Sequence, residues 1–166
     1  AKTYKTVDGG VFFGGTFQAG SLSIARQSTA ATGSLDVGTG AFVIPGATSS
    51  LSITASLTIS ASQLGLGVCP TSLPSYSLIV NIQQFIGGAW QNIGGNNTVM
   101  TAECLQEGQE KIISVNGGVT VNSSLSVSVG QSVTLRATAV APSLPLTIDG
   151  LNLQGVRALS IAVSGN

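Results

Sequence analysis

Apolar and hydroxyl residues alternate along much of this chain. From residue 51 to residue 60 the sequence reads Leu-Ser-Ile-Thr-Ala-Ser-Leu-Thr-Ile-Ser, without a break in the alternation. Because successive side chains of a β-strand point to opposite faces of the sheet, this pattern places the apolar residues on one face and the hydroxyls on the other. The same alternation occurs at residues 125–129, 133–138 and 156–163. The pattern predicts half-buried strands whose outer faces carry Ser and Thr.

Shorter apolar runs predict the other strands, and Gly-Gly or Asn-Gly sequences between them favour turns. The additional strands are expected at residues 11–17, 21–25, 41–44, 76–86, 89–93, 98–101, 111–115 and 119–122. The clearest hairpin is predicted where Gly87 and Gly88 join two apolar strands. Turns are also expected at residues 9–10, 94–95 and 116–118, whereas a bulge is expected at residues 14–15. Only residues 101–111 suggest a short helix or turn, because three glutamates there would share one helical face.

About ten to twelve short strands separated by turns predict an all-β protein, an antiparallel β-sandwich or jelly-roll barrel. No linker, run of charge or shift in composition divides the chain. We therefore expect a single domain over residues 1–166, long enough to bury about two-thirds of its unfolded surface.

Charged residues make up 7% of the chain, against about 25% in a typical soluble domain. Residues 37–102 contain no Asp, Glu, Lys, Arg or His. This stretch does not predict a spanning helix, since polar residues interrupt every apolar run. Six basic residues balance six acidic ones, so nothing favours binding to nucleic acid.

The chain has no histidine, which excludes Ser–His and Cys–His nucleophilic catalysis. A pair of carboxylates could still act, as in glycoside hydrolysis, or hold calcium. The acidic residues are Asp8, Asp36, Glu103, Glu107, Glu110 and Asp149. Three of them crowd a polar segment without a calcium-loop pattern, which is more typical of a solvated loop. We expect no enzyme activity, no cofactor and no metal.

The chain has two cysteines, Cys69 and Cys104. A disulfide between them would close a loop of about 36 residues and stabilise the fold by roughly 3.5–4 kcal/mol on the loop-entropy estimate. The alternative is two buried free thiols. Two cysteines without histidine do not form a recognisable zinc site.

Tyr76 and Trp90 are candidates for an aromatic platform that binds sugars, with neighbouring amides as hydrogen-bond partners. The amides are Gln91, Asn92, Asn96 and Asn97. The alternative, which we favour, is that Trp90 fills the core beside its hairpin.

Neutral Ser/Thr faces lack the charges that normally discourage association between sheets. They therefore favour a structural subunit that self-assembles, such as a viral capsid, decoration or spike protein. The alternative is a secreted or cell-surface binding module, an adhesin or carbohydrate-binding domain. The N-terminal residues contain no apolar core of signal-peptide length, so either a leader has been removed or, as we prefer, only an initiator methionine. A low-charge protein without a leader is easiest to place in a virus particle released by lysis.

The alternating stretches at 51–60, 125–129 and 133–138, together with the neutral stretch 37–102, give the chain a resemblance to a viral family. It resembles the small single-barrel capsid proteins of tailless icosahedral phages of thermophilic bacteria, which enclose an internal membrane. The resemblance implies a jelly-roll barrel, homo-oligomeric capsomers, a second capsid protein as partner and a lipid bilayer beneath the shell. It carries no diagnostic motif and assigns no functional residue.

Overall fold

The computed structural model describes residues 50–165 except 129 and 143, and the backbone of five strands before residue 50. Thirteen strands and no helix occur in these residues. They are β1 (Lys2–Asp8), β2 (Thr16–Gln18), β3 (Leu22–Gln27), β4 (Ser34–Leu35), β5 (Ala41–Pro45), β6 (Ser50–Leu66), β7 (Ser75–Ile86), β8 (Ala89–Thr101), β9 (Glu103–Glu107), β10 (Glu110–Ser126), β11 (Ser132–Val140), β12 (Leu146–Ile148) and β13 (Leu151–Gly165).

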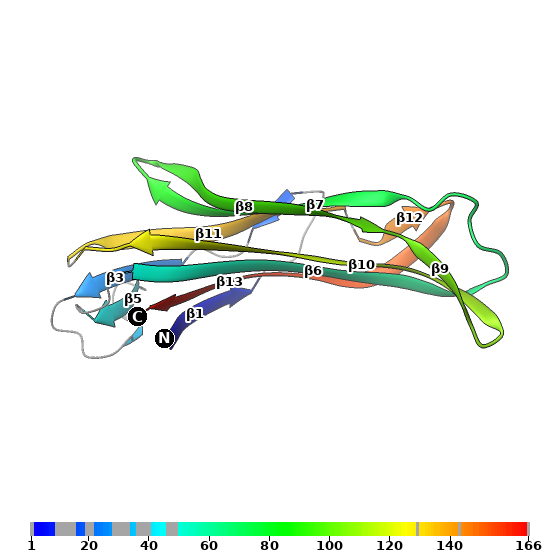
Figure 1. The fold of residues 1–166 in the computed structure, drawn as a ribbon, viewed down its shortest axis with the longest axis horizontal. Coiled ribbons are helices and arrows are strands. Elements are labelled where there is room, and N and C mark those ends of the chain that lie inside the picture. Colours follow the sequence, from blue (N-terminus) through cyan, green and yellow to red (C-terminus); the bar gives the residue numbers. More distant parts are fainter. Residues whose placement is uncertain are drawn as a thin grey trace.

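The strands form two sheets that pack as a sandwich. One sheet has the order β1-β13-β6-β10-β9, with β12 added to β13, and the other has the order β4-β5-β3-β11-β7-β8, with β2 added to β11. All pairs are antiparallel except β3 with β5. The long strands β6, β10 and β13 run nearly the length of the molecule, which is elongated along them (Figure 1). The predicted all-β sandwich is confirmed.

The predicted alternation of β6 is also confirmed. Its apolar residues between Leu51 and Ala61 are at most 2% exposed and lie in one hydrophobic core between the sheets. The facing layer comes from Leu78, Val80 and Ile82 of β7 and from the inward residues of β11. Burial of this regular apolar face is what selects the register, because a shift of one residue would turn every hydroxyl inward.

The predicted hairpin at residues 85–90 is confirmed. Ile86 pairs with Ala89, and the two residues of the turn have positive φ, 61° at Gly87 and 83° at Gly88. Two positive φ values define the type I′ turn, whose twist matches that of the flanking strands.

Two other glycine pairs were wrongly predicted as turns, since β8 and β10 run straight through them. Gly94 and Gly95 lie in β8 beside a register shift opposite Ile82 and Gln83, and Gly117 lies inside β10. A Cβ on Gly117 would lie 2.8 Å from the Cβ of Met100, so this glycine allows close packing between the sheets. The strands predicted at 89–93 and 98–101 are therefore both part of β8, and those predicted at 111–115 and 119–122 are both part of β10.

Of the short helix or turn predicted at residues 101–111, the structure contains the turn and no helix. These residues form the β9–β10 hairpin, in which Glu107 pairs with Glu110 and Gly108 has a φ of 63°. The strand predicted at 125–129 ends at Ser126, and only the end of the strand predicted at 11–17 falls on β2. The features expected at residues 9–10 and 14–15 lie outside the described residues.

Side chains connect the two sheets along one edge of the sandwich. Asn96 of β8 donates its Nδ2 hydrogen to the carbonyl oxygen of Thr120 in β10 at 2.9 Å. The hydroxyl of Ser123 donates to the carbonyl oxygen of Ile93 at 3.0 Å. These bonds occupy backbone acceptors that an exposed edge would otherwise offer to another strand.

Candidate functional site

The outer face of β6 and β10 is a ladder of neutral polar pairs. Thr54 donates to Asn122 Oδ1 at 2.8 Å, and Ser60 donates in the same way to Asn116 at 2.8 Å. Between these pairs lies the hydroxyl pair of Ser56 and Thr120 at 3.2 Å. From residue 50 to 62 and from residue 112 to 126 neither strand contains an ionisable residue. The hydroxyls predicted to face outward therefore do so, and they form hydrogen bonds with amide and hydroxyl side chains across the strands.

The outer face of β11, β7 and β8 carries three exposed aliphatic side chains, which we call the apolar patch: Ile79, Val99 and Val140. Val140 pairs directly with Ile79, and Val99 lies diagonally across from Ile79 because its own partner is Ser77. Their exposed fractions are 37% for Ile79, 62% for Val99 and 41% for Val140. Three neighbouring aliphatic residues on a solvent-facing sheet are a candidate contact surface.

Trp90 lies on this same outer face, at the hairpin end of the sheet, and not in the core as we had favoured. Its ring meets the ring of Phe85 edge-on, with the centroids 5.2 Å apart. The guanidinium carbon of Arg136 lies 4.2 Å above the centroid of the Trp90 ring. Arg136 also donates from Nε to Gln83 Oε1 at 2.7 Å, and Gln83 donates to Asn92 at 2.8 Å. Partial burial lowers the pKa of Arg136 from its ordinary value.

Arg136 is the one charged residue within the described parts of β7, β8 and β11. Its guanidinium lies over an aromatic face, where the ring quadrupole stabilises a cation. The outer surfaces of both sheets are therefore nearly free of charge over their long strands.

The structure does not bring Tyr76 and Trp90 together, so the candidate aromatic platform does not form. Tyr76 pairs with Met100 at one end of the β7–β8 hairpin, whereas Trp90 pairs with Phe85 beside the turn at the other end. The two side chains also lie on opposite faces, since Tyr76 packs against the core. This burial raises the pKa of Tyr76 above its ordinary value.

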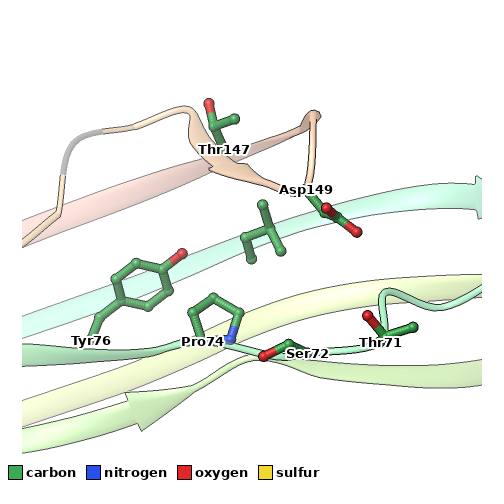
Figure 2. A pocket seen from close by; sticks show the side chains of 7 residues that line it. Thr71, Ser72, Pro74, Tyr76, Thr147 and Asp149 are labelled. Atoms are coloured by element: carbon green, nitrogen blue, oxygen red, sulfur yellow. The ribbon is translucent and has the colours of Figure 1, made fainter.

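Tyr76 instead borders a hollow of about 280 Å³ at the end of the sandwich. One wall consists of residues 71–76, and the other of Thr147, Ile148 and Asp149 from the β12–β13 hairpin (Figure 2). A second hollow of about 470 Å³ shares Thr71 and Asp149 with the first and continues along residues 67–70 to Leu151. We call the two hollows together the end groove. Sequence reasoning identified Tyr76 as a candidate but missed its partners, which come from a segment some seventy residues away.

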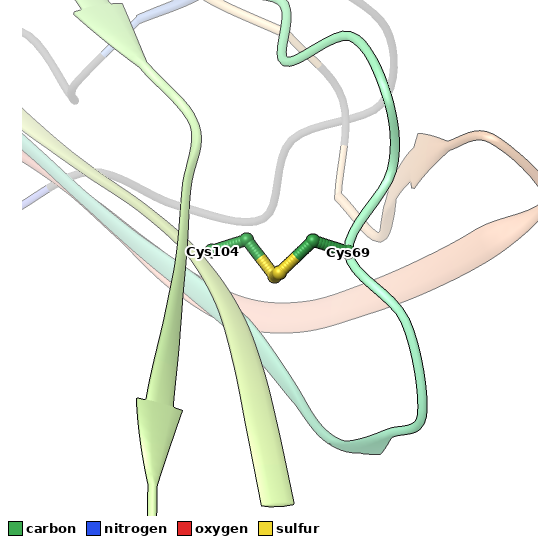
Figure 3. The surroundings of a disulfide bond; sticks show 2 residues. All are labelled: Cys69 and Cys104. Carbon is green, nitrogen blue, oxygen red and sulfur yellow. A yellow bond between two sulfur atoms is a disulfide. The ribbon is translucent and has the colours of Figure 1, made fainter.

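Cys69 and Cys104 form a disulfide, with an S–S distance of 2.03 Å and Cα atoms 5.9 Å apart. The bond joins the loop that follows β6 to β9 (Figure 3). Cys69 also lines the end groove, so the bond anchors one wall of it. Of the two alternatives, a disulfide and two buried free thiols, the structure contains the disulfide. Disulfides persist in oxidising surroundings, such as outside the cell or on virion surfaces.

The acidic residues do not gather into a site among the described residues. No three Cys, Asp or Glu side chains in the described ranges lie close enough together to hold a metal ion. Glu107 and Glu110 are backbone partners beside the turn of the β9–β10 hairpin, whereas Asp149 lies in the β12–β13 turn. Asp36 falls outside the described residues, and only the backbone of Asp8 is described. The described ranges also contain no helix that could span a bilayer.

Arg157 is the second partly buried arginine. Its Nη1 donates to the carbonyl oxygen of Pro142 at 2.7 Å, which ties β13 to the segment after β11. Burial lowers the pKa of Arg157 below its ordinary value. This contact gives Arg157 a structural role in the edge of the sandwich.

No protein-family model matches the chain, and no curated protein matches it significantly.

Proposed function

We propose that this protein is a structural subunit of a virion shell, a capsid or shell-decoration protein that self-associates through its neutral sheet surfaces. The observation that carries the proposal is the apolar patch of Ile79, Val99 and Val140 on the outer face of β7, β8 and β11, where the one charged residue of these three strands, Arg136, lies over the ring of Trp90. Such a surface can be buried against another subunit without desolvating an unpaired charge, which is the costly step in forming an interface.

A second copy of the chain is the partner that best fits this surface. The molecule has balanced charge, and the outer faces of its long strands β6, β7, β8 and β11 carry Arg136 as their one charge, so two copies can meet there with little repulsion. The apolar patch, centred on Ile79, can also pack against the same patch of a second copy across a twofold axis. Twofold symmetry is the commonest geometry of homo-oligomers. Aromatic side chains of Phe85 and Trp90 extend the same face toward the hairpin end.

The disulfide supports a location outside a reducing cytoplasm, because cytosolic thiols are normally kept reduced. A virion released from its host meets this condition, and so does a protein of the cell surface. The resemblance to internal-membrane phage capsid proteins adds two further expectations, a second capsid protein as partner and a bilayer beneath the shell. Direct contact with nucleic acid is not expected, since the chain has no excess of basic residues.

The proposal is tested by light scattering coupled to size-exclusion chromatography over a range of protein concentrations. The unaltered chain should associate, and Ile79→Lys should make it monomeric, because the substitution places a charge at the centre of the patch. Leu105→Lys is the matched control, since Leu105 is a comparably exposed aliphatic residue on β9, in the other sheet. It should leave association unchanged. An unaltered chain that stays monomeric at every concentration contradicts the proposal, as does an Ile79→Lys variant that associates normally.

A further inference from the structure

The end groove contains polar side chains that have no partner within the described structure. Thr71, Ser72, Tyr76 and Asp149 make no side-chain hydrogen bond to any described residue. In the same wall as Asp149, the hydroxyl of Thr147 donates to Asn152 at 3.1 Å and keeps acceptor capacity. The groove thus offers three free hydroxyls, those of Thr71, Ser72 and Tyr76, on one wall and the carboxylate of Asp149 on the other.

Apolar surfaces lie between these polar groups. The ring of Tyr76 and the ring of Pro74 stand side by side on one wall (Figure 2). Ile148 of the β12–β13 hairpin also lines the hollow. A sugar ring has C–H faces that pack on such surfaces and a rim of hydroxyls that exchange hydrogen bonds with side-chain hydroxyls and carboxylates. Ligand sites in general combine apolar walls with a few convergent polar groups in this way, and the two hollows are in the usual range of size.

Both walls of the groove are held in place by the fold. The disulfide of Cys69 fixes the loop that provides residues 67–74. The opposite wall is a two-residue hairpin turn in which Asp149 and Gly150 have φ values of 52° and 81°. This is the type I′ geometry that an Asp-Gly pair favours, so the carboxylate is presented by a rigid turn. Fixed walls reduce the ordering cost of binding.

The charge of the groove selects among ligand classes. Asp149 is the one ionisable group besides Tyr76 among the described residues that line it, and no Lys or Arg is present there. An anionic ligand would meet a carboxylate and no cation. A cationic ligand would use Asp149 but would leave the hydroxyl hydrogens without acceptors. The hydroxyl groups of a neutral ligand can donate hydrogen bonds to the Asp149 carboxylate and accept them from the hydroxyls of the groove.

We propose that the end groove binds a neutral carbohydrate, with the Tyr76 and Pro74 rings against a sugar face and Asp149 accepting hydrogen bonds from sugar hydroxyls. This site is separate from the apolar patch, because Tyr76 and Ile79 project from opposite faces of β7. Binding and self-association can therefore be tested independently. The groove contains Tyr76 but not Trp90, the other residue of the candidate aromatic platform.

The test is a titration of the isotope-labelled full chain, followed by amide NMR, with four neutral trisaccharides: maltotriose, cellotriose, mannotriose and triacetylchitotriose. At least one should shift the amide signals of residues 71–76 and 147–151 at millimolar concentration. Tyr76→Ala should weaken that binding at least tenfold, and Asp149→Asn at least fivefold. Asparagine is chosen because it tolerates the left-handed turn conformation.

Two control variants locate the site. Trp90→Ala removes an aromatic ring at the far end of the β7–β8 hairpin, and Glu110→Gln removes a carboxylate outside the residues that line the groove. Both should bind the sugar as the unaltered chain does. The proposal is overturned if no trisaccharide shifts the groove signals, if Trp90→Ala abolishes binding, or if spermidine shifts those signals while the sugars do not. Light scattering on Asp149→Asn should show unchanged association, which separates failure of this site from failure of the shell proposal.

Discussion

At Gly155 the strands β13 and β6 approach too closely for any side chain. A Cβ built there would collide with the carbonyl oxygen of Ser60 and would lie 2.6 Å from the Cα of Ala61. Both are backbone atoms in the central pair of one sheet, so rotation of a side chain cannot relieve the contact. Glycine in a strand interior normally weakens the strand, and here it is the residue that permits the pairing.

We therefore predict that Gly155→Ala lowers the free energy of unfolding by about 2–3 kcal/mol, the cost of overpacking at a site that cannot shift easily. Urea denaturation measures the change. Gly67→Ala is the control, because nothing lies within 4 Å of its added Cβ and its φ is not positive. It should change stability by less than about 0.5 kcal/mol. Equal effects of the two substitutions would contradict this account of Gly155.

Single residues were also where sequence reasoning was least reliable. A glycine pair predicts a turn, yet Gly94, Gly95 and Gly117 lie within strands because they adjoin a register shift or face the opposite sheet. Trp90 gave no sequence signal that it would lie under Arg136, since the two residues become neighbours only when β11 pairs with β7. Contacts of this kind depend on the order of strands, which the local pattern does not contain.

At the scale of elements, prediction succeeded where the signal was local. The unbroken alternation of β6 and the Gly-Gly turn of the β7–β8 hairpin were both read from consecutive residues. For residues 101–111 the sequence left a short helix and a turn open, because three glutamates recur at helical spacing while Gly108 interrupts them, and the structure contains the turn. The end groove was missed because its walls, residues 67–76 and 147–151, are far apart in the chain.

The disulfide joins elements that are separated by the whole β7–β8 hairpin. It closes a loop with a sequence separation of 35, which restricts the unfolded chain. We predict that replacing both Cys69 and Cys104 by alanine lowers the free energy of unfolding by roughly 3–4 kcal/mol. Urea denaturation of the double variant measures this, and the unaltered chain under reductant provides a second comparison. A reduced chain whose two thiols are titratable but whose stability is unchanged would contradict the prediction.

At the scale of the whole molecule, the distribution of charge is the feature that most affects association. The ionisable residues of the described structure lie largely at strand ends and turns, as with Glu107, Glu110 and Asp149, while the long sheet faces present hydroxyls, amides and aliphatic groups. An interface made from these faces is stabilised by burial of apolar surface and by neutral hydrogen bonds. Dissolved salt screens neither contribution.

The association constant of the chain should therefore not fall when salt is added, whereas that of a complex held by ion pairs would fall. Raising sodium chloride from about 0.05 M to 1 M shortens the Debye length from roughly 14 Å to 3 Å, which would dissociate an interface held by ion pairs. For this protein we predict a change of less than about twofold in the association constant. Sodium sulfate should strengthen association, because excluded salts favour the burial of surface.

Analytical ultracentrifugation measures both effects, with Ile79→Lys as the non-associating reference. Dissociation in sodium chloride would show that charged residues near the strand ends, and not the neutral faces, hold the subunits together.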